Sequence, residues 1–393
     1  MTVRRGYHFF QNPGPTNIPE RVLRAMDRSV IDFHGAEFKA LSDECFAGLK
    51  RIFKTKGAVL AYAATGHGAW ESALLNILSP GEKILVVDCG FFSMNWGMRG
   101  ETFGLEVETL PGDWRLPANP ERLEARLRED RDHKIKAVLA VHNETSTGVA
   151  HPIKELREAI DAARHPALFL VDTISSLASF DFRMDEWGVD VVVAGSQKGL
   201  MLPAGMAFIG VGDRALAASA EAKLPRLYWD WRRLLEGSSQ SLWNGTAPVH
   251  FFYGLRESLL MIEEEGLENV FARHHRLAEA TRRAVEVWRG NDGPEFYALD
   301  PGARSDTVTA VWLPEDHDGD KVRGIALERF NVALGGGLGH LKGRLVRIGH
   351  LGDLNETMIL GALGAVEMSF SLAGVPYGKG GVAAAMEYLV RGE

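Results

Sequence analysis

Short, nearly continuous apolar runs alternate through the first two-thirds of the chain with longer segments in which apolar residues recur at helical spacing. Runs of this kind are typical of strands that are covered on both faces of a sheet. The alternation favours a doubly wound, mostly parallel α/β sheet over a β-sandwich. We predict strands at Ala58–Ala63, Lys83–Asp88, Lys136–Val141, Ala167–Asp172, Val189–Ala194 and Met206–Val211, and helices at Ala69–Leu78, Pro120–Arg128 and Ile153–Ala163.

The pattern changes near residues 260–275, where a long helical stretch, Leu267–Arg289, follows a polar run. Beyond it, strand-like and helix-like segments mix as in a smaller α+β unit, at Thr307–Leu313, Lys321–Phe330, Leu345–Ile348 and Asn355–Leu372. The first sixteen residues contain Asn12-Pro13-Gly14-Pro15 and are predicted to be irregular and to lie across both parts. We therefore expect an N-terminal segment at 1–16, a large domain at 17–265 and a small C-terminal domain at 266–393.

Composition and charge exclude several classes of protein. The 393 residues include 44 basic and 52 acidic side chains, a formal net charge of −8, which argues against binding to a nucleic-acid backbone. No apolar run approaches the ~20 residues of a membrane span, and no apolar stretch that would make a signal peptide follows the N-terminal arginines. The only cysteines, Cys45 and Cys89, suit a reducing compartment and exclude a disulfide scaffold. We expect a cytoplasmic protein.

A glycine-containing turn, Thr65-Gly66-His67-Gly68, lies between a predicted strand and a predicted helix. A turn at a helix N-terminus exposes N–H groups and the positive end of the helix dipole, so a phosphate can bind there. The signal is weak alone, because such turns are common. The turn lacks the third glycine of a dinucleotide fingerprint and the Gly-Lys-Ser/Thr of a P-loop, so an NAD-dependent oxidoreductase loses support.

Asp172 and Lys198 follow two predicted strands that are one strand–helix–strand step apart. Both side chains would then reach the same edge of the sheet, which is where open α/β sheets bind ligands. Asp172 is equally compatible with a helix N-cap or a turn, and a lysine after a strand is more often a solvated loop residue. If Lys198 is instead desolvated, its lowered pKa would let it form a Schiff base.

Arg347 lies inside an apolar strand-like run, Val346–Gly349, where a cation needs an anionic partner. Its planar guanidinium can form two parallel hydrogen bonds with a carboxylate. The alternative is a structural salt bridge between domains. Together, a phosphate turn, a sheet-edge carboxylate, a Schiff-base lysine and a carboxylate-binding arginine are the parts of a pyridoxal-phosphate enzyme that acts on amino acids.

The sequence resembles the class V, fold type I aminotransferases nearly end to end, and most closely the serine–glyoxylate and alanine–glyoxylate group. The resemblance rests on Asn12–Asn17, Thr65–Gly68, His142–Gly148, Val171–Asp172, Gly195–Leu200 and Arg347–His350. It implies a large domain with a mixed, mostly parallel seven-stranded sheet, a smaller C-terminal α+β domain and pyridoxal 5'-phosphate as cofactor. It also implies a homodimer with composite active sites.

The resemblance assigns roles to individual residues. Lys198 would carry the cofactor as a Schiff base, and Asp172 would pair with the pyridine nitrogen. Thr145 would donate its hydroxyl to the ring oxygen, and Phe92 would stack on the ring. The remaining cofactor contacts would be Thr65, Gly66, His67, Ser176 and Gln197, with Trp243 and Thr246 at the neighbouring subunit's phosphate, and the substrate contacts would be Gly14, His34 and Arg347.

Two positions depart from the family pattern. Trp243 stands where alanine–glyoxylate enzymes have a tyrosine, and Asp32-Phe33-His34 stands where the serine–glyoxylate group usually has Asp-His-Arg. Arg347 is then the only strong candidate for holding a carboxylate. We expect transfer from a small neutral amino acid, serine before alanine, to glyoxylate through a pyridoxamine-phosphate form. Aspartate–glyoxylate or another amino acid–2-oxo acid exchange is the alternative.

Other chemistry is less well supported. A desulfurase needs a cysteine in the last third of the chain, whereas both cysteines lie before residue 90, so they are expected to be small core residues and a lyase is disfavoured. No metal site is predicted. The glycine run Gly335-Gly336-Gly337-Leu338-Gly339 is interpreted as a flexible loop near the substrate.

Overall fold

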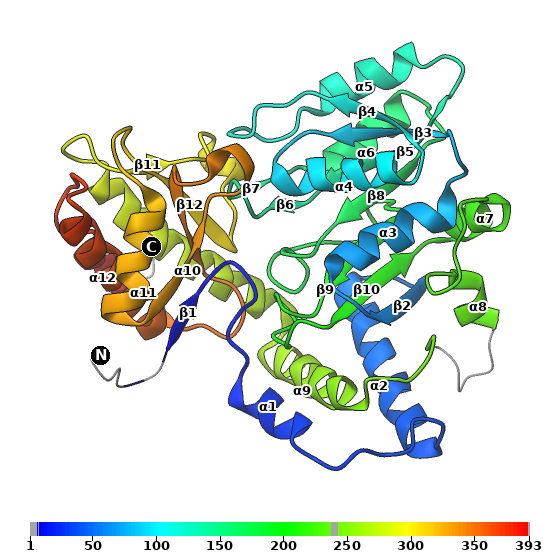
Figure 1. The fold of residues 1–393 in the computed structure, drawn as a ribbon, viewed down its shortest axis with the longest axis horizontal. Coiled ribbons are helices and arrows are strands. Elements are labelled where there is room, and N and C mark those ends of the chain that lie inside the picture. The colour runs from blue at the N-terminus through cyan, green and yellow to red at the C-terminus, as the bar shows by residue number, and fades with distance from the viewer. Residues whose placement is uncertain (1–5, 7, 237–242, 392–393) are drawn as a thin grey trace.

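A computed structural model describes residues 6, 8–236 and 243–391 of the chain. Two large β-sheets, each packed against its own helices, lie side by side (Figure 1), and a third sheet of two short strands, β6 (Asn143–Glu144) and β7 (Val149–Ala150), follows β5 along the chain. The larger sheet belongs to the first two-thirds of the chain, and the smaller one combines the C-terminal third with a strand from the N-terminus.

The larger sheet has seven strands, as the family resemblance implies. Their order is β2 (Ala58–Ala63), β10 (Met206–Val211), β9 (Val191–Gly195), β8 (Leu168–Asp172), β5 (Ile135–Val141), β3 (Lys83–Val87) and β4 (Glu106–Leu110). All neighbouring strands from β9 to β4 are parallel, whereas β10 pairs antiparallel with both β2 and β9. The parallel strands therefore end together at one edge of the sheet.

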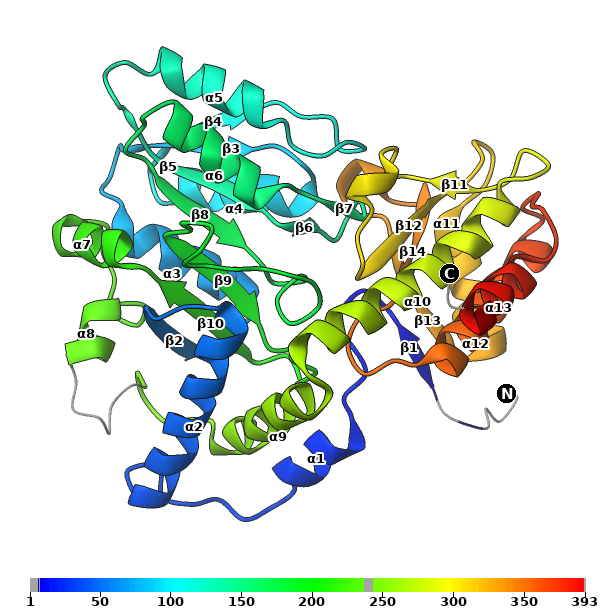
Figure 2. The ribbon, with the colours of Figure 1, turned by 180° about the vertical axis from the view of Figure 1, so that it is seen from behind.

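Helices cover both faces of this sheet (Figures 1 and 2). One face packs on α2 (Ala36–Phe53), α5 (Pro120–Glu129), α6 (Ile153–Ala162) and α9 (Val249–Glu265), and the other on α3 (Gly66–Ile77), α4 (Phe91–Thr102), α7 (Asp213–Glu221) and α8 (Trp231–Glu236). Alternate residues of each strand enter the two cores: Phe169 and Val171 face the first, and Leu170 faces the second. Burial on both faces explains why the strands are almost wholly apolar.

The six predicted strands agree with the structure to within about two residues at each end, which is the usual scatter of element boundaries. The seventh, β4, escaped prediction because it is the more polar and more exposed of the two edge strands. Its side chains alternate Glu106, Val107 and Glu108, and none of its residues is fully buried. Polar residues on an edge strand weaken the apolar signal on which the other predictions rest.

The smaller sheet has the order β1 (Phe9–Gln11), β13 (Val332–Gly336), β14 (Leu345–Gly349), β12 (Val308–Trp312) and β11 (Glu295–Phe296). Its apolar face packs on α10 (Leu267–Trp288), α11 (Gly319–Phe330), α12 (Glu356–Ala373) and α13 (Gly381–Arg391). Val346 and Ile348 of β14 enter this core. Because strand residues alternate between faces, Arg347 points to the other face.

Two expectations for this part of the chain are corrected. The N-terminal segment is not wholly irregular, since Phe9–Gln11 forms β1 and pairs parallel with β13. The glycine run is not wholly a loop either, because Gly335 and Gly336 belong to β13 and pair with β14. A Cβ at Gly335 would crowd Pro13 and Arg347, so glycine is needed for the close approach of the N-terminal segment.

Of the described residues, one helix, α12, is long and apolar enough to cross a membrane by length and composition. Its residues Ile359, Leu363, Val366 and Phe370 are fully buried against the smaller sheet and its helices. We interpret α12 as the central core helix of this unit.

Candidate active site

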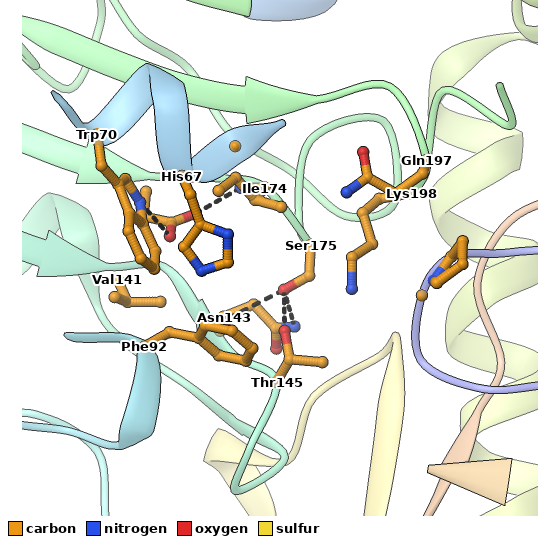
Figure 3. Close-up of a pocket in the computed structure, with 14 residues that line it drawn as sticks. His67, Trp70, Phe92, Val141, Asn143, Thr145, Ile174, Ser175, Gln197 and Lys198 are labelled. Carbon is orange, nitrogen blue, oxygen red and sulfur yellow. Dashed lines mark hydrogen bonds between the residues drawn. The ribbon is translucent and has the colours of Figure 1, made fainter. Parts of the chain in front are cut away.

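A cavity opens where the parallel strands β5 and β8 end (Figure 3). Its wall brings together residues that are far apart in the sequence. They are Gly14, Pro15, Gly66, His67, Trp70, Phe92, Val141, Asn143, Thr145, Asp172, Ile174, Ser175, Gln197 and Lys198. The sheet edge predicted from the strand pattern is therefore the place where the candidate residues meet.

Lys198 extends its amine into this cavity from the loop after β9 (Figure 3). The side chain is 8% exposed, and Nζ donates a 2.6 Å hydrogen bond to the carbonyl of Pro13. Burial, followed by the charge of Arg347, lowers the pKa of Lys198 to about 7. Much of the amine is then neutral and nucleophilic near neutral pH. The alternative of a solvated loop lysine is wrong.

Gly14 contacts Lys198 directly. A Cβ built on Gly14 would overlap the end of the Lys198 side chain, and the backbone of Gly14 has a φ of +126°, which other residues rarely adopt. Gly14 therefore gives the lysine the room that it occupies beside the N-terminal segment.

Asp172 ends β8 with its carboxyl group buried at the cavity wall. Oδ1 accepts a 2.6 Å hydrogen bond from the backbone N–H of Ile174, and Oδ2 accepts a 2.9 Å bond from the indole N–H of Trp70. Burial raises the pKa of Asp172 to about 7, against the effects of these donors and of Lys198. A carboxyl group in this setting pairs readily with a cationic N–H in the cavity.

The phosphate turn lies at the N-terminus of α3, where Gly66 and His67 line the cavity. No side chain caps this end of the helix, so its first N–H groups are available to an anion. A Cβ at Gly66 would overlap Ile174, so only glycine lets the turn approach β8 this closely. Thr65 precedes the turn as N-cap and is exposed, outside the cavity wall.

Two buried amide oxygens at the cavity, Asn143 Oδ1 and Gln197 Oε1, have no hydrogen-bond partner among the described residues. Asn143 is held by bonds from its Nδ2 to the hydroxyls of Ser175 and Thr307, both 2.8 Å. Buried polar atoms without partners are rare in native proteins. Both amides therefore point to a polar ligand in the cavity.

Thr145 lines the cavity, but its hydroxyl donates a 2.7 Å bond to Ser175 Oγ. The predicted bond to a cofactor oxygen would therefore require the Thr145 proton to change its acceptor. The neighbouring carboxyl group of Glu144 is fully buried and accepts from the backbone N–H groups of Phe92 and Ser93. Glu144 thereby fixes the start of α4 and the position of the Phe92 ring.

Arg347 is 7% exposed and lies beside the cavity rather than in its wall. Nε donates to the carbonyl of Gly336 at 2.7 Å, and Nη1 donates to that of Thr145 at 2.8 Å. Among the described residues it forms no ion pair, so the predicted alternative of an interdomain salt bridge is wrong. A buried guanidinium without a carboxylate partner is costly and favours binding of an anion.

Besides Thr65 and Arg347, four predicted residues do not line the cavity of their own chain. Ser176 is corrected to Ser175, because the Ser176 hydroxyl is buried behind the wall in a 3.0 Å bond with His142 Nδ1. The His34 side chain is 66% exposed and its ring packs on Phe33. The Trp243 indole donates to the carbonyl of Thr246 instead of to a ligand, and Thr246 is exposed.

The residues that were not predicted to line the cavity are Pro15, Trp70, Val141, Asn143, Ile174 and Ser175. Asn143 and Ser175 follow the ends of β5 and β8 within three residues. This position next to two strand ends could have predicted them as cavity residues. Trp70 had no such signal, since an apolar position in a helix is typical of a core residue. Cys45 and Cys89 are buried away from the cavity, as expected, which removes the cysteine chemistry of a desulfurase.

The residues present fit pyridoxal 5'-phosphate. A buried amine can take its aldehyde, a buried carboxyl group its ring nitrogen, and a helix N-terminus its phosphate, while the two unpartnered amides supply further polar contacts. When bound, this cofactor accepts electron density from the substrate's α-carbon.

Comparisons with known proteins agree with this geometry. Residues 8–341 match the family model described as aminotransferase class V. The chain is 46% identical to a serine–glyoxylate aminotransferase of Methylorubrum extorquens, over 99% of this chain and 97% of that protein. It is 44% identical to an L-aspartate–glyoxylate aminotransferase of Paracoccus denitrificans, over 96% and 94%.

The fold agrees as well. A crystal structure of a ureidoglycine–glyoxylate aminotransferase from Bacillus subtilis superposes with a TM-score of 0.89 at 27% identity, covering 99% of this chain and 100% of that one. The chain therefore belongs to the class V aminotransferases, whose cofactor is pyridoxal 5'-phosphate.

Proposed function

We propose that this enzyme transfers the amino group of a short neutral amino acid, serine before alanine, to glyoxylate. The observation that carries the proposal is the convergence of Lys198, Asp172 and the α3 N-terminus on one cavity, with Arg347 beside it. In this proposal Lys198 holds the cofactor and moves the substrate's α-proton. Asp172 keeps the ring nitrogen protonated, and Arg347 binds the α-carboxylate through the guanidinium edge that the protein leaves without an ion pair.

The choice of a neutral donor follows from the charges near the cavity. Apart from Lys198, no arginine or lysine of the described residues lines the cavity wall. A dicarboxylic donor would leave its second carboxylate without a cation, unless the partner subunit supplied one. Relatives named for serine and for aspartate are almost equally similar, so aspartate remains the second candidate donor.

The comparison that tests the proposal is kcat/KM for serine, alanine and aspartate with glyoxylate. We expect serine to exceed aspartate in the wild type, and His34→Arg to shift preference toward aspartate by roughly ten- to a hundredfold, because a charge-assisted hydrogen bond contributes about 1.5–3 kcal/mol. His133→Arg, at an exposed histidine just before β5 at the opposite edge of the sheet, is the matched control. A wild type that prefers aspartate would overturn the donor assignment.

We further propose a homodimer whose active sites are shared between subunits. Support comes from His34, Trp243 and Thr246, which the family pattern assigns to the site but which lie outside the cavity of their own chain. Leu227 and Tyr228, in the stretch that leads to α8, also leave apolar surface exposed. A partner subunit would cover such surface and bring the missing residues to the cavity.

Mixing two inactive variants tests this arrangement. Lys198→Ala lacks the amine, and Thr246→Glu would repel the partner's cofactor phosphate. Refolded together in equal amounts, they should recover up to about one quarter of wild-type activity, because half of the dimers are mixed and each has one intact site. In the control, Lys198→Ala is mixed with a variant that carries both Lys198→Ala and Thr246→Glu. This mixture should recover no activity, because neither chain has the amine. A fully active monomer in light scattering would contradict the proposal.

A further inference from the structure

Trp70 contacts the carboxyl group of Asp172 from the wall of the cavity. Figure 3 shows the Trp70 side chain in that wall. Trp70 lies one helical turn beyond Gly66, so α3 presents its free N-terminal end and this indole to the same site. We propose that Trp70 is a positioning residue that holds the Asp172 carboxylate in one orientation and keeps it ionised, and so sets the protonation of the cofactor's ring nitrogen. This inference rests on the role proposed for Asp172.

The two protein donors to Asp172 favour its charged form. The Trp70 indole N–H bonds to Oδ2, and the backbone N–H of Ile174 bonds to Oδ1. Neither donor has a lone pair that could accept a proton from the carboxyl group, so both stabilise the carboxylate over the acid. Burial acts in the opposite direction and raises the pKa of Asp172 to about 7. Near neutral pH, each donor therefore decides much of the charge on Asp172.

The other titratable groups that face Asp172 do not replace this contact. The Lys198 amine lowers the pKa of Asp172, but the indole and the Ile174 N–H have larger effects. Glu144, beyond β5, is an acid and disfavours a second negative charge. His142 donates its backbone N–H to the Asp172 carbonyl, and burial lowers the pKa of its ring to about 3, so the ring is neutral.

Aromatic packing fixes the indole in place. Trp70 is 1% exposed, and its ring lies parallel to that of Trp96 within 15° at a centroid distance of 6.0 Å. The Trp96 indole donates to the Trp70 carbonyl at 3.3 Å, and the His67 ring meets Trp70 edge-on at 4.7 Å. The N–H can therefore not turn away from Asp172 unless this stack opens.

Arg99 of α4 strengthens the donor. Its guanidinium lies 5.0 Å from the centroid of the Trp70 ring, and its nearest carboxylate, on Glu71, is 3.9 Å away. A cation against an aromatic ring withdraws electron density from it, which makes the indole N–H a better hydrogen-bond donor. The charge of Arg99 thus acts on Asp172 through Trp70.

The pH titration of the visible absorption of the holoenzyme distinguishes this role from simple core packing. In Trp70→Phe, loss of the donor should lower the ratio of ionised to neutral Asp172 about tenfold, a pKa change of about one unit. The ring nitrogen is then protonated in a smaller fraction of the molecules. The positive charge that lowered the pKa of the lysine-bound nitrogen is lost with that proton, so this pKa rises. We expect the midpoint of the absorption change to rise by about one pH unit.

Trp96→Phe is the matched control, because it removes an indole N–H from the same stack without touching Asp172. Its midpoint should stay at the wild-type value. An unchanged midpoint in Trp70→Phe, or an equal shift in Trp96→Phe, would overturn the proposal. Asp172→Asn belongs in the same series: if its midpoint does not move, the role of Asp172 itself fails, whereas a shift there without one in Trp70→Phe refutes only the part assigned to Trp70.

If Trp70→Phe does not fold, the indole N–H resonances of the ¹⁵N-tryptophan-labelled holoenzyme take its place. One resonance other than that of Trp96, which is identified by its loss in Trp96→Phe, should shift when Asp172 is replaced by asparagine. The absence of such a shift would count against the hydrogen bond and against the proposal.

Discussion

Lys198→Ala is expected to lower kcat by at least about 10⁴-fold, because two functions of one amine disappear together and each contributes roughly 10²–10⁴-fold. In the proposed arrangement the amine bonds covalently to the cofactor and is also the base closest to the substrate's α-carbon. The α3 N-terminus and Asp172 remain, so the variant should still bind the cofactor non-covalently. Steady-state kinetics and the absorption spectrum of the variant measure both effects.

Borohydride reduction of the wild type followed by peptide mapping identifies the attachment site independently. The adduct is expected on Lys198, which is the only lysine in the described cavity wall. Lys83→Ala is the matched control, since Lys83 pairs with Glu106 at the far end of β3 and should leave turnover unchanged. An adduct on another lysine, or a Lys198→Ala enzyme within tenfold of wild type, would refute the assignment.

The lowered pKa of Lys198 gives this prediction a pH dependence. Burial and the charge of Arg347 favour the neutral amine and bring its pKa to about 7. Only the neutral amine attacks an aldehyde, so covalent attachment to the apoenzyme should accelerate as pH rises from 6 toward 8 and then level off. In Arg347→Met the cationic neighbour is lost, and the midpoint should move to higher pH. Stopped-flow absorption at a series of pH values measures this midpoint.

The larger sheet was predictable because burial on both faces leaves a strong trace in the sequence. Strands such as β8 and β9 are continuous apolar runs, whereas the edge strand β4 alternates glutamate with apolar residues and was missed. β13 was missed for a different reason. Glycine does not favour strands, so Gly335 and Gly336 give no strand signal in the sequence. They form a strand because they pair with β14 and because the N-terminal segment lies against Gly335.

The candidate site was predictable where chemistry requires one residue type at a strand end, as for Asp172 and Lys198. Resemblance to a family added Phe92, Thr145 and Gln197, which no periodicity distinguishes. Residues that act through other residues carry no such signal. Trp70 has the spacing of an ordinary core residue in α3, and its hydrogen bond to Asp172 at the end of β8 arises only when α3 packs on β9 and β10.

His34, Trp243 and Thr246 illustrate a limit of a different kind. Their family roles place them at a site, but the fold of one chain leaves them outside its own cavity. For Trp243 the indole N–H is already bonded to the Thr246 carbonyl, so its contribution to a partner's site would come from the ring face rather than from the donor. In the proposed dimer these residues would serve the partner's cavity, an arrangement that the sequence of one chain does not record.

Asp172→Asn is expected to lower kcat by roughly 10- to 1000-fold, because an adjacent opposite charge shifts a pKa by about 1–3 units. The substitution removes the charge that, in the proposed mechanism, keeps the cofactor's ring nitrogen protonated at neutral pH. Without that protonation the ring accepts electron density from the substrate poorly, and loss of the α-proton slows. Single-turnover reaction with serine, monitored by the cofactor's absorption, measures this step apart from product release.

The local geometry makes asparagine informative. The side-chain amide keeps the size of the carboxyl group, and its oxygen can still accept from one of the two donors, Trp70 or the Ile174 N–H. The amide NH₂ must then face the other donor, so part of the loss will come from that clash. Asp172→Asn combined with Trp70→Phe removes this clash but does not restore the missing charge. The kcat of the double variant should therefore stay far below that of the wild type.

Asp190→Asn controls for loss of a buried carboxylate from the same sheet. Asp190 accepts from the Phe169 backbone N–H and pairs with Arg214 at the opposite edge, away from the cavity. This variant should lose thermal stability but keep the rate of the first half-reaction. If Asp172→Asn kept near-normal turnover while binding cofactor fully, the ring nitrogen would not depend on Asp172, and the pairing at the centre of the proposed mechanism would be wrong.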